Sequence, residues 1–379
     1  MDFRKRRKKM TKILAPSKFD VVGSFLRPRD LKIAREKFSK GEISGEELRE
    51  VEDREIEKLV KKQKEAGLKI ISDGEFRRSW WHFDFFWGLN GIEKYTLAED
   101  ELIHFHGETL RPDGVKIVGK IGGKNHPFLD HYKFVKGFED ENTVAKQTIP
   151  SPAQLLRGVY NQIKEGNPYE DVGEFIKDVA EAYGDFFQEI YDIGCRNLQL
   201  DDCAWGSVVD PNFAERFHVD AKSVEELKEE YLKINNDAIE KAPEGLNITT
   251  HICRGNYKSH YASEGSYDSV ADYVLAREKV SAFYLEYDDE RSGDFKALAK
   301  IPTGKKVVIG IVTSKRPELE DKEELKKRIK EATRYIPLEN ICISPQCGFS
   351  STEEGNAVTE EDQWKKIALL KEVAEEVLI

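Results

Sequence analysis

Short apolar runs alternate along the chain with long, charged stretches of helical periodicity. Between 45 and 66, apolar residues recur every three or four positions while Glu and Lys occupy the other faces. That apolar stripe consists of Leu48, Val51, Ile56 and Val60. The run VVIGIV at 307–312 is apolar throughout, as expected of a strand that is buried on both faces. The alternation predicts a parallel sheet covered by helices.

Eight strands are predicted, and helices separate most of them. The predicted strands are 20–22, 69–72, 144–149, 197–200, 246–251, 282–286, 306–312 and 341–344. The predicted helices are 29–37, 45–66, 152–160, 172–193, 224–242, 269–280, 322–335 and 360–377. Repeats of strand and helix in this number fit an α/β fold of the (β/α)8 TIM barrel type.

One stretch, from about 80 to 142, breaks the alternation. Around Pro112-Asp113-Gly114 the pattern predicts a β-hairpin between HFHGETL and VKIVGKIG. We interpret the stretch as an insertion after strand two that lies over one mouth of the barrel. Its aromatic cluster has two interpretations. We favour packing of the aromatic side chains within the insertion, and the alternative is a wall on which a planar donor molecule stacks. The cluster comprises Trp80, Trp81, Phe83, Phe85, Phe86 and Trp87.

The predicted domains are a basic N-terminal arm at 1–18 and a single catalytic barrel at 19–379. No apolar run follows the basic residues, so the arm is not a secretory signal, and Met10 is an alternative start. A net charge of −11 argues against a nucleic-acid-binding protein, and no run of about 18 apolar residues predicts a membrane helix. Five cysteines are few and odd in number, which favours reduced thiols in a cytoplasmic protein.

The most informative pair is His251 and Cys253, at the end of a predicted strand. Alternate residues of a strand point to the same side, so both side chains can reach one metal ion. An isolated pair is more often a packed histidine beside an inert cysteine. Glu286 ends the next predicted strand and Cys347 follows the last one, and the C-terminal ends of barrel strands meet at one face. One His, two Cys and a carboxylate form a tetrahedral set that suits Zn²⁺.

Further polar residues lie at other predicted strand ends. Ser24 follows the first strand, and Glu75 lies in SDGE after the second. Asp201 and Asp202 end the strand NLQL. Helix caps and turns are the ordinary explanation for each. Glu75 and Asp201 together on one face instead suggest binding of a substrate cation such as an amino group.

Seven short motifs follow one another along the chain, and they are VGSF, KGEISGEEL, SDGEFRR, LQLDD, THICRGN, YLE and SPQCG. Similar motifs occur in the same order in cobalamin-independent methionine synthase. The chain therefore resembles the C-terminal catalytic barrel of that family, in its short single-barrel form. The resemblance implies transfer of a methyl group to the thiol of homocysteine, forming methionine, without cobalamin as a prosthetic group. The zinc ligands that it implies are His251, Cys253, Glu286 and Cys347. The homocysteine-binding residues that it implies are Ser24, Glu75 and Asp201.

The donor side of the site departs from the family pattern. Thr313, Ser314 and Lys315 stand where the family has a histidine associated with the methyl-folate reaction, and PSPAQLL matches the folate-side motif only loosely. Methyltetrahydrofolate, a methylcorrinoid protein and a small sulfonium are therefore all considered as donors. The alternative function is a zinc-dependent alkyltransferase or thioether-cleaving enzyme of the same fold acting on another thiol. A structural zinc protein fits less well, because structural sites usually have four Cys or His ligands.

Overall fold

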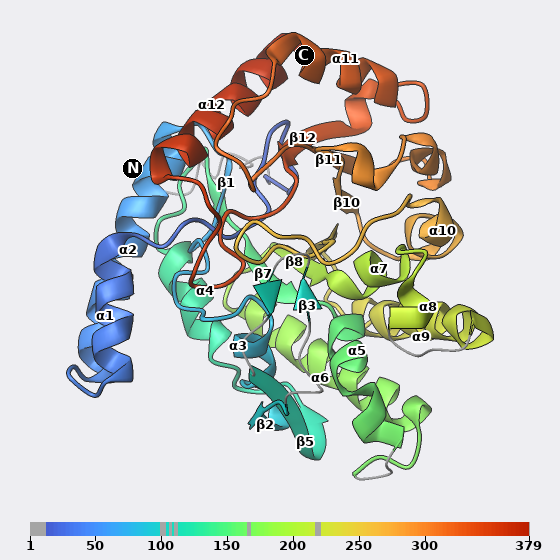
Figure 1. Cartoon of the computed structure of the whole chain (residues 1–379). Helices are drawn as coiled ribbons and strands as arrows, with labels where there is room; N and C mark the ends of the chain where they lie inside the picture. The colour runs from blue at the N-terminus through green and yellow to red at the C-terminus, as the bar shows by residue number, and fades with distance from the viewer. Residues whose placement is uncertain are drawn as a thin grey trace, which may run out of the picture.

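The central sheet consists of six parallel strands in the order β12-β11-β10-β9-β8-β7. This computed structural model describes residues 13–98, 104–105, 108–109, 113–164, 168–216 and 221–378. Strands that are adjacent in the sheet also follow one another along the chain, so each connection crosses back over the outside (Figure 1). The strands are β7 (Gln147–Pro150), β8 (Asn197–Asp202), β9 (Asn247–Ile252), β10 (Ala282–Glu286), β11 (Lys306–Val312) and β12 (Ile341–Pro345).

Helices fill the connections and surround the strands (Figure 1). The longer ones are α1 (Arg29–Ser39), α2 (Gly45–Glu65), α4 (Phe128–Lys136), α5 (Pro152–Lys164), α6 (Val172–Asp192), α9 (Ala221–Ile239), α11 (Lys322–Ala332) and α12 (Glu360–Val377). Shorter pieces are α3 (Phe83–Phe86), α7 (Cys203–Val208), α8 (Phe213–Arg216), α10 (Asp268–Val270) and 3₁₀ turns at Glu290–Ser292, Lys296–Lys300 and Leu338–Asn340. Within the described ranges, no helix combines the length and apolar character needed to cross a bilayer.

The predicted helices are confirmed within a few residues, with one exception. The helix predicted over 269–280 is present over 268–277, but α10 leads into a π-helical turn at Ala271–Leu275 and the helix ends early. The side chain of Asn236 in α9 accepts a hydrogen bond from the Lys279 amide and donates one to the Arg277 carbonyl. Because these backbone groups are satisfied by a side chain, the helix ends there.

Two predicted strands are shorter or broken. The segment 20–22 forms no strand; Phe19 makes an isolated parallel bridge to Ile343 of β12. The strand predicted at 144–149 is interrupted at Lys146, which separates β6 (Val144–Ala145) from β7. β6 pairs in parallel with β1 (Ile70–Ile71). The parallel α/β architecture is therefore as predicted, whereas the closed eight-stranded barrel stays a prediction.

The antiparallel part of the stretch 80–142 has a different pairing from the predicted hairpin. β5 (Asp113–Gly122) pairs with β2 (Asn90–Thr96), whereas the described residues 104–105 and 108–109 of the predicted partner strand do not pair with it. Ile92 lies opposite Ile117, and both are buried, so β2 supplies the apolar partner that the alternating residues of β5 require. The short strands β3 (His104–Phe105) and β4 (Glu108–Thr109) pair with each other. That the whole stretch is an insertion over the barrel mouth stays a prediction.

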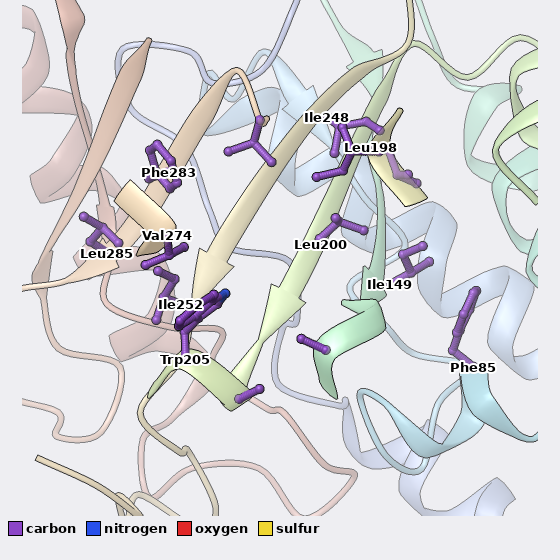
Figure 2. Close-up of a cluster of buried hydrophobic side chains, with 14 of the residues drawn as sticks. Phe85, Ile149, Leu198, Leu200, Trp205, Ile248, Ile252, Val274, Phe283 and Leu285 are labelled. Carbon is purple, nitrogen blue, oxygen red and sulfur yellow. The ribbon is translucent and has the colours of Figure 1, made fainter. Parts of the chain in front are cut away.

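Side-chain alternation separates a packing face from an inner face. On the packing face lie the labelled side chains Leu198, Leu200, Ile248, Ile252, Phe283 and Leu285, from three neighbouring strands, together with Trp205 of α7 (Figure 2). The residues between them point the other way, and a smaller cluster forms there from Val22, Tyr284, Val308 and Cys342. Because strand side chains alternate, residues such as Asp201, His251 and Glu286 share the inner face with this cluster.

The N-terminal segment crosses the starting ends of two strands. Of the predicted basic arm, 1–18, residues 1–12 lie outside the described part of the chain. From 13 onward the chain is held in place, because the Ala15 amide donates to Asn197 Oδ1 at 2.8 Å and Asn247 Nδ2 donates to the Ala15 carbonyl at 2.9 Å. These two asparagines begin β8 and β9. Residues 13–18 therefore lie at the end of the sheet opposite the C-terminal strand ends.

Candidate metal centre and substrate site

Four potential metal ligands meet at the C-terminal ends of three strands. His251 is on β9, Cys253 follows it, Glu286 ends β10, and Cys347 lies two residues after β12. One ligand atom from each residue lies within 4.8 Å of all the others, and the two sulfur atoms are 3.7 Å apart. All four side chains are buried. The four residues proposed from the sequence are therefore close enough to bind one ion.

The hydrogen bonding of this cluster fits a cation. Neither ring nitrogen of His251 makes a hydrogen bond of normal length to the described residues, although the ring lies beside Cys347. Glu286 Oε1 accepts the Arg254 amide at 2.8 Å, while its Oε2 has no partner in the described part of the chain. Leaving buried polar atoms unpaired costs about 1–3 kcal/mol each. A divalent cation would satisfy one ring nitrogen of His251 and Glu286 Oε2 together, and the mixed N/O/S donor set suits zinc.

The three predicted substrate-binding residues line the same cavity as three of the potential ligands. This cavity is lined by Ser24, Glu75 and Asp201 and by His251, Cys253 and Cys347. Glu286 lies behind the lining. A molecule with a thiol at one end and an amino-acid group at the other could therefore contact both sets of residues.

Glu75 is held in an unusual backbone conformation. Its φ is +62°, in the left-handed region that residues with a side chain seldom adopt. The Asp73 carboxylate accepts the Glu75 amide at 2.8 Å and stabilises this turn. Glu75 Oε1 accepts the Thr148 hydroxyl at 2.9 Å and lies 3.4 Å from Arg78, whereas Oε2 has no partner among the described residues. One carboxylate oxygen is thus fixed and the other is free for a ligand.

The neighbouring aspartates Asp201 and Asp202 have opposite orientations and different roles. Asp202 caps α7, because its Oδ1 accepts the Trp205 amide at 3.0 Å. Asp201 faces the cavity, where Gln199 Nε2 donates to its Oδ1 at 2.7 Å. Burial raises the pKa of Asp201 to about 8, and the nearby charge of Glu75 adds to this effect. A cationic ligand between the two carboxylates would reduce their repulsion.

Ser24 packs closely against the loop that carries Cys347. Its Oγ accepts the Ser350 amide at 3.3 Å, and a Cβ added at Gly348 would lie only 1.9 Å from that Oγ. A glycine is therefore required at 348, because Ser24 approaches the backbone there too closely for a side chain.

We expect Gly348→Ala to destabilise the protein by about 1–3 kcal/mol, measured by urea unfolding, because the new methyl group overlaps Ser24. Adding Ser24→Ala removes the overlapping oxygen and restores much of that loss, so the two effects are non-additive. Gly158→Ala in α5 is the matched control, since a Cβ there meets nothing within 4 Å. An unchanged unfolding midpoint for Gly348→Ala would contradict this packing argument.

The aromatic cluster at 80–87 divides between the two explanations considered from the sequence. Phe85 and Phe86 are buried in the core, as the packing explanation predicts. Trp80, Trp81 and Phe83 line the cavity, together with His82. His82, to which the sequence assigned no role, is kept neutral because burial lowers its pKa to about 3. One wall of the cavity is therefore aromatic and uncharged.

Arg27 is a supporting residue that sequence reasoning missed. Its buried guanidinium donates to the carbonyls of Glu75 at 2.6 Å and Ser350 at 2.6 Å. It thereby joins the segments that carry Ser24, Glu75 and Cys347. The sequence offers one signal, an arginine three residues after Ser24 in an otherwise apolar run, but that signal does not identify its partners.

The fold and the cluster together define a parallel α/β protein with a candidate metal centre at its strand ends. The family model described as the catalytic domain of cobalamin-independent synthase matches residues 19–370. The chain belongs to this family, as the resemblance of its motifs predicted. It has the α/β fold of the B12-independent methionine synthase catalytic domain.

Relatives match nearly the whole chain. Uncharacterized protein YxjH of Bacillus subtilis (strain 168) is 43% identical over 364 residues, which are 96% of this chain and 95% of the relative. A structure from Listeria monocytogenes, described as a candidate vitamin-B12-independent methionine synthase, is 37% identical, with a TM-score of 0.76 over 97% of this chain and 99% of its own. A B12-independent methionine synthase from Shewanella sp. W3-18-1, in complex with selenomethionine, is 18% identical and similar in fold, with a TM-score of 0.71 over 95% of this chain and 97% of its own.

Proposed function

We propose that this protein is a zinc-dependent methyltransferase that transfers a methyl group to the thiol of homocysteine and forms methionine. The observation that carries the proposal is the His251, Cys253, Glu286 and Cys347 cluster, of which His251, Cys253 and Cys347 line one cavity with two inward-facing carboxylates. Family membership, and a structural relative named as a methionine synthase in complex with selenomethionine, support it. We further propose that the parallel strands close into an eight-stranded barrel, with this cavity at its C-terminal mouth.

In this proposal the four cluster residues hold zinc, and the opposite side of the cavity holds the amino-acid group. Bound zinc would supply the Lewis acidity that keeps a substrate thiol deprotonated and nucleophilic near neutral pH. Glu75 and Asp201 bind the substrate ammonium through their carboxylates. Ser24 and the backbone amides beside it bind the substrate carboxylate. These contacts fix the distance and direction from the amino-acid group to the sulfur atom.

The transfer forms a sulfur–carbon bond and breaks the bond between that carbon and its donor. The thiol proton leaves to solvent before the carbon is attacked. The aromatic wall of Trp80, Trp81 and Phe83 excludes water from one side of the reacting sulfur. Methyltetrahydrofolate and a methylcorrinoid protein are the two donors that we propose to test first.

The proposal is tested by zinc-edge X-ray absorption of the purified protein, with and without homocysteine. We expect a shell of two sulfur and two nitrogen or oxygen ligands that gains a third sulfur when homocysteine is added. Absence of stoichiometric zinc would overturn the metal assignment. A zinc shell that homocysteine leaves unchanged would remove homocysteine as the substrate.

A specific observation supports the alternative, a zinc-dependent alkyltransferase or thioether-cleaving enzyme acting on another thiol. Ser314 and Thr313 are tied to neighbouring loops, because the Ser314 hydroxyl donates to the Gly348 carbonyl at 2.9 Å and the Thr313 amide donates to Glu320 at 2.8 Å. Neither residue is among those that line the cavity. If homocysteine leaves the zinc shell unchanged and another thiol adds a sulfur to it, the alternative is favoured.

A further inference from the structure

Lys146 is a buried lysine on the inner side of the sheet, beneath the cavity. It occupies the break between β6 and β7, and its side chain is about 1% exposed. Its Nζ donates to the Val21 carbonyl at 2.7 Å and to Gln199 Oε1 at 2.9 Å. Asp20 Oδ1 lies 3.7 Å away and supplies an opposite charge. A fully buried ammonium is costly unless it is paired in this way, so its position requires an explanation.

Gln199 connects this ammonium to the cavity. Its Oε1 accepts from Lys146, and its Nε2 donates both to Asp201 Oδ1 at 2.7 Å and to the Val22 carbonyl at 2.7 Å. An ammonium can only donate, so Lys146 requires the oxygen of the Gln199 amide to point toward it. The NH₂ group of that amide must then point toward Asp201.

The same two side chains also fix the segment that leads to Ser24. Residues 20–22 form no strand, and the carbonyls of Val21 and Val22 accept hydrogen bonds from Lys146 and Gln199. Buried carbonyls without a partner would be unfavourable, so these side chains replace part of the missing backbone ladder. Ser24 lies two residues beyond Val22.

We propose that Lys146 is a positioning residue for the amino-acid half of the substrate site. Acting through Gln199 and the Val21 and Val22 carbonyls, it sets the positions of both Asp201 and Ser24 in the lining of the cavity. It touches neither the metal cluster nor the substrate. This inference rests on the proposed function, since it assumes that the ligand carries an amino-acid group.

The test compares two thiols that differ in the group Lys146 is inferred to serve. Homocysteine carries an ammonium and a carboxylate, whereas 2-mercaptoethanol carries neither. Absorption titrations of the cobalt-substituted protein measure the binding of each thiol. The dissociation constant of 2-mercaptoethanol divided by that of homocysteine then measures recognition of the amino-acid half. We expect Lys146→Met to lower this ratio about tenfold or more while binding of 2-mercaptoethanol is unchanged.

The control is Tyr284→Phe. Tyr284 contacts the same buried cluster, with its hydroxyl donating to Asp20 at 2.8 Å, but it contacts neither Gln199 nor Asp201 through that bond. We expect this variant to keep the wild-type ratio. Gln199→Met removes the connection to Asp201 at Gln199 instead of at Lys146, and it provides the test if Lys146→Met does not fold. We expect it to lower the ratio of dissociation constants by the same factor.

The outcomes separate the two proposals. A wild-type ratio that persists in both Lys146→Met and Gln199→Met would overturn the positioning role and leave the proposed function intact. Wild-type protein that binds both thiols equally would overturn homocysteine as substrate and the positioning role with it. A general loss of structure would weaken binding of both thiols, which the 2-mercaptoethanol titration would detect.

Discussion

Replacing Cys347 by serine is expected to weaken zinc binding by roughly a hundredfold or more and to abolish most methyl transfer. A serine hydroxyl is a poor ligand at neutral pH, because it stays protonated where a cysteine can supply a thiolate. The substitution changes one atom in a buried loop, where the sulfur lies 3.7 Å from Cys253 Sγ and 3.9 Å from Ser351 Oγ and beside the His251 ring. The fold should therefore persist. Zinc content after dialysis against a chelator, turnover and circular dichroism measure the three effects.

The matched control for Cys347→Ser is Cys195→Ser. Cys195 is also fully buried, and its thiol donates to the Asn197 carbonyl at 3.3 Å, a bond that serine can make. It lies at the opposite end of β8 from the cavity. Zinc content and turnover should match the wild type in this control. Full turnover in Cys347→Ser would show that the cluster is not the reaction centre.

Neutralising either cavity carboxylate should weaken homocysteine binding by about 10- to 100-fold while zinc content is unchanged. Glu75→Gln and Asp201→Asn keep the size of each side chain and remove the negative charge that each can carry beside a bound ammonium. The loss follows because a buried ammonium requires opposite charge close by, and an amide cannot provide it. Homocysteine affinity is measured by calorimetry on zinc-loaded protein.

The control for these charge changes is Asp202→Asn. Asp202 is adjacent to Asp201 and also buried, but its Oδ1 caps α7, a role that asparagine performs well, and its Oδ2 accepts Asn235 Nδ2 at 3.0 Å. Asparagine loses the bond to Asn235, which affects stability and leaves the charge that faces the cavity unchanged. We expect wild-type homocysteine affinity in Asp202→Asn. If Glu75→Gln and Asp201→Asn also bind homocysteine as the wild type does, another thiol becomes the better candidate, as in the alternative function.

The two predictions can be tested independently, because different strands and loops support the metal cluster and the two cavity carboxylates. The cluster residues are carried by β9, β10 and the loop after β12, whereas Glu75 and Asp201 follow β1 and end β8. Arg27 joins the two sides only through backbone carbonyls. A change in one half can therefore alter one function of the cavity without removing the other.

The sequence by itself determined the parallel α/β class, most of the helices and the strands β10 and β11 to the residue. These elements have long periodic patterns or uniformly apolar runs, whose physical requirements are local. It also singled out His251, Cys253, Glu286 and Cys347, because each lies at or just beyond the end of a strand and parallel strands end at one edge. Their approach to within 4.8 Å agrees with that reasoning.

Only the tertiary structure decided which partners a segment or side chain has when its local sequence pattern allows several. The segment 20–22 has strand-like composition, yet its carbonyls bond to Lys146 and Gln199, which lie more than a hundred residues away along the chain. The partner of β5 depended on where Ile92 could be buried, and the different roles of Asp201 and Asp202 depended on which side of β8 each occupies. Local sequence encodes periodicity and chemistry, whereas side-chain partners across the fold depend on how distant segments pack together.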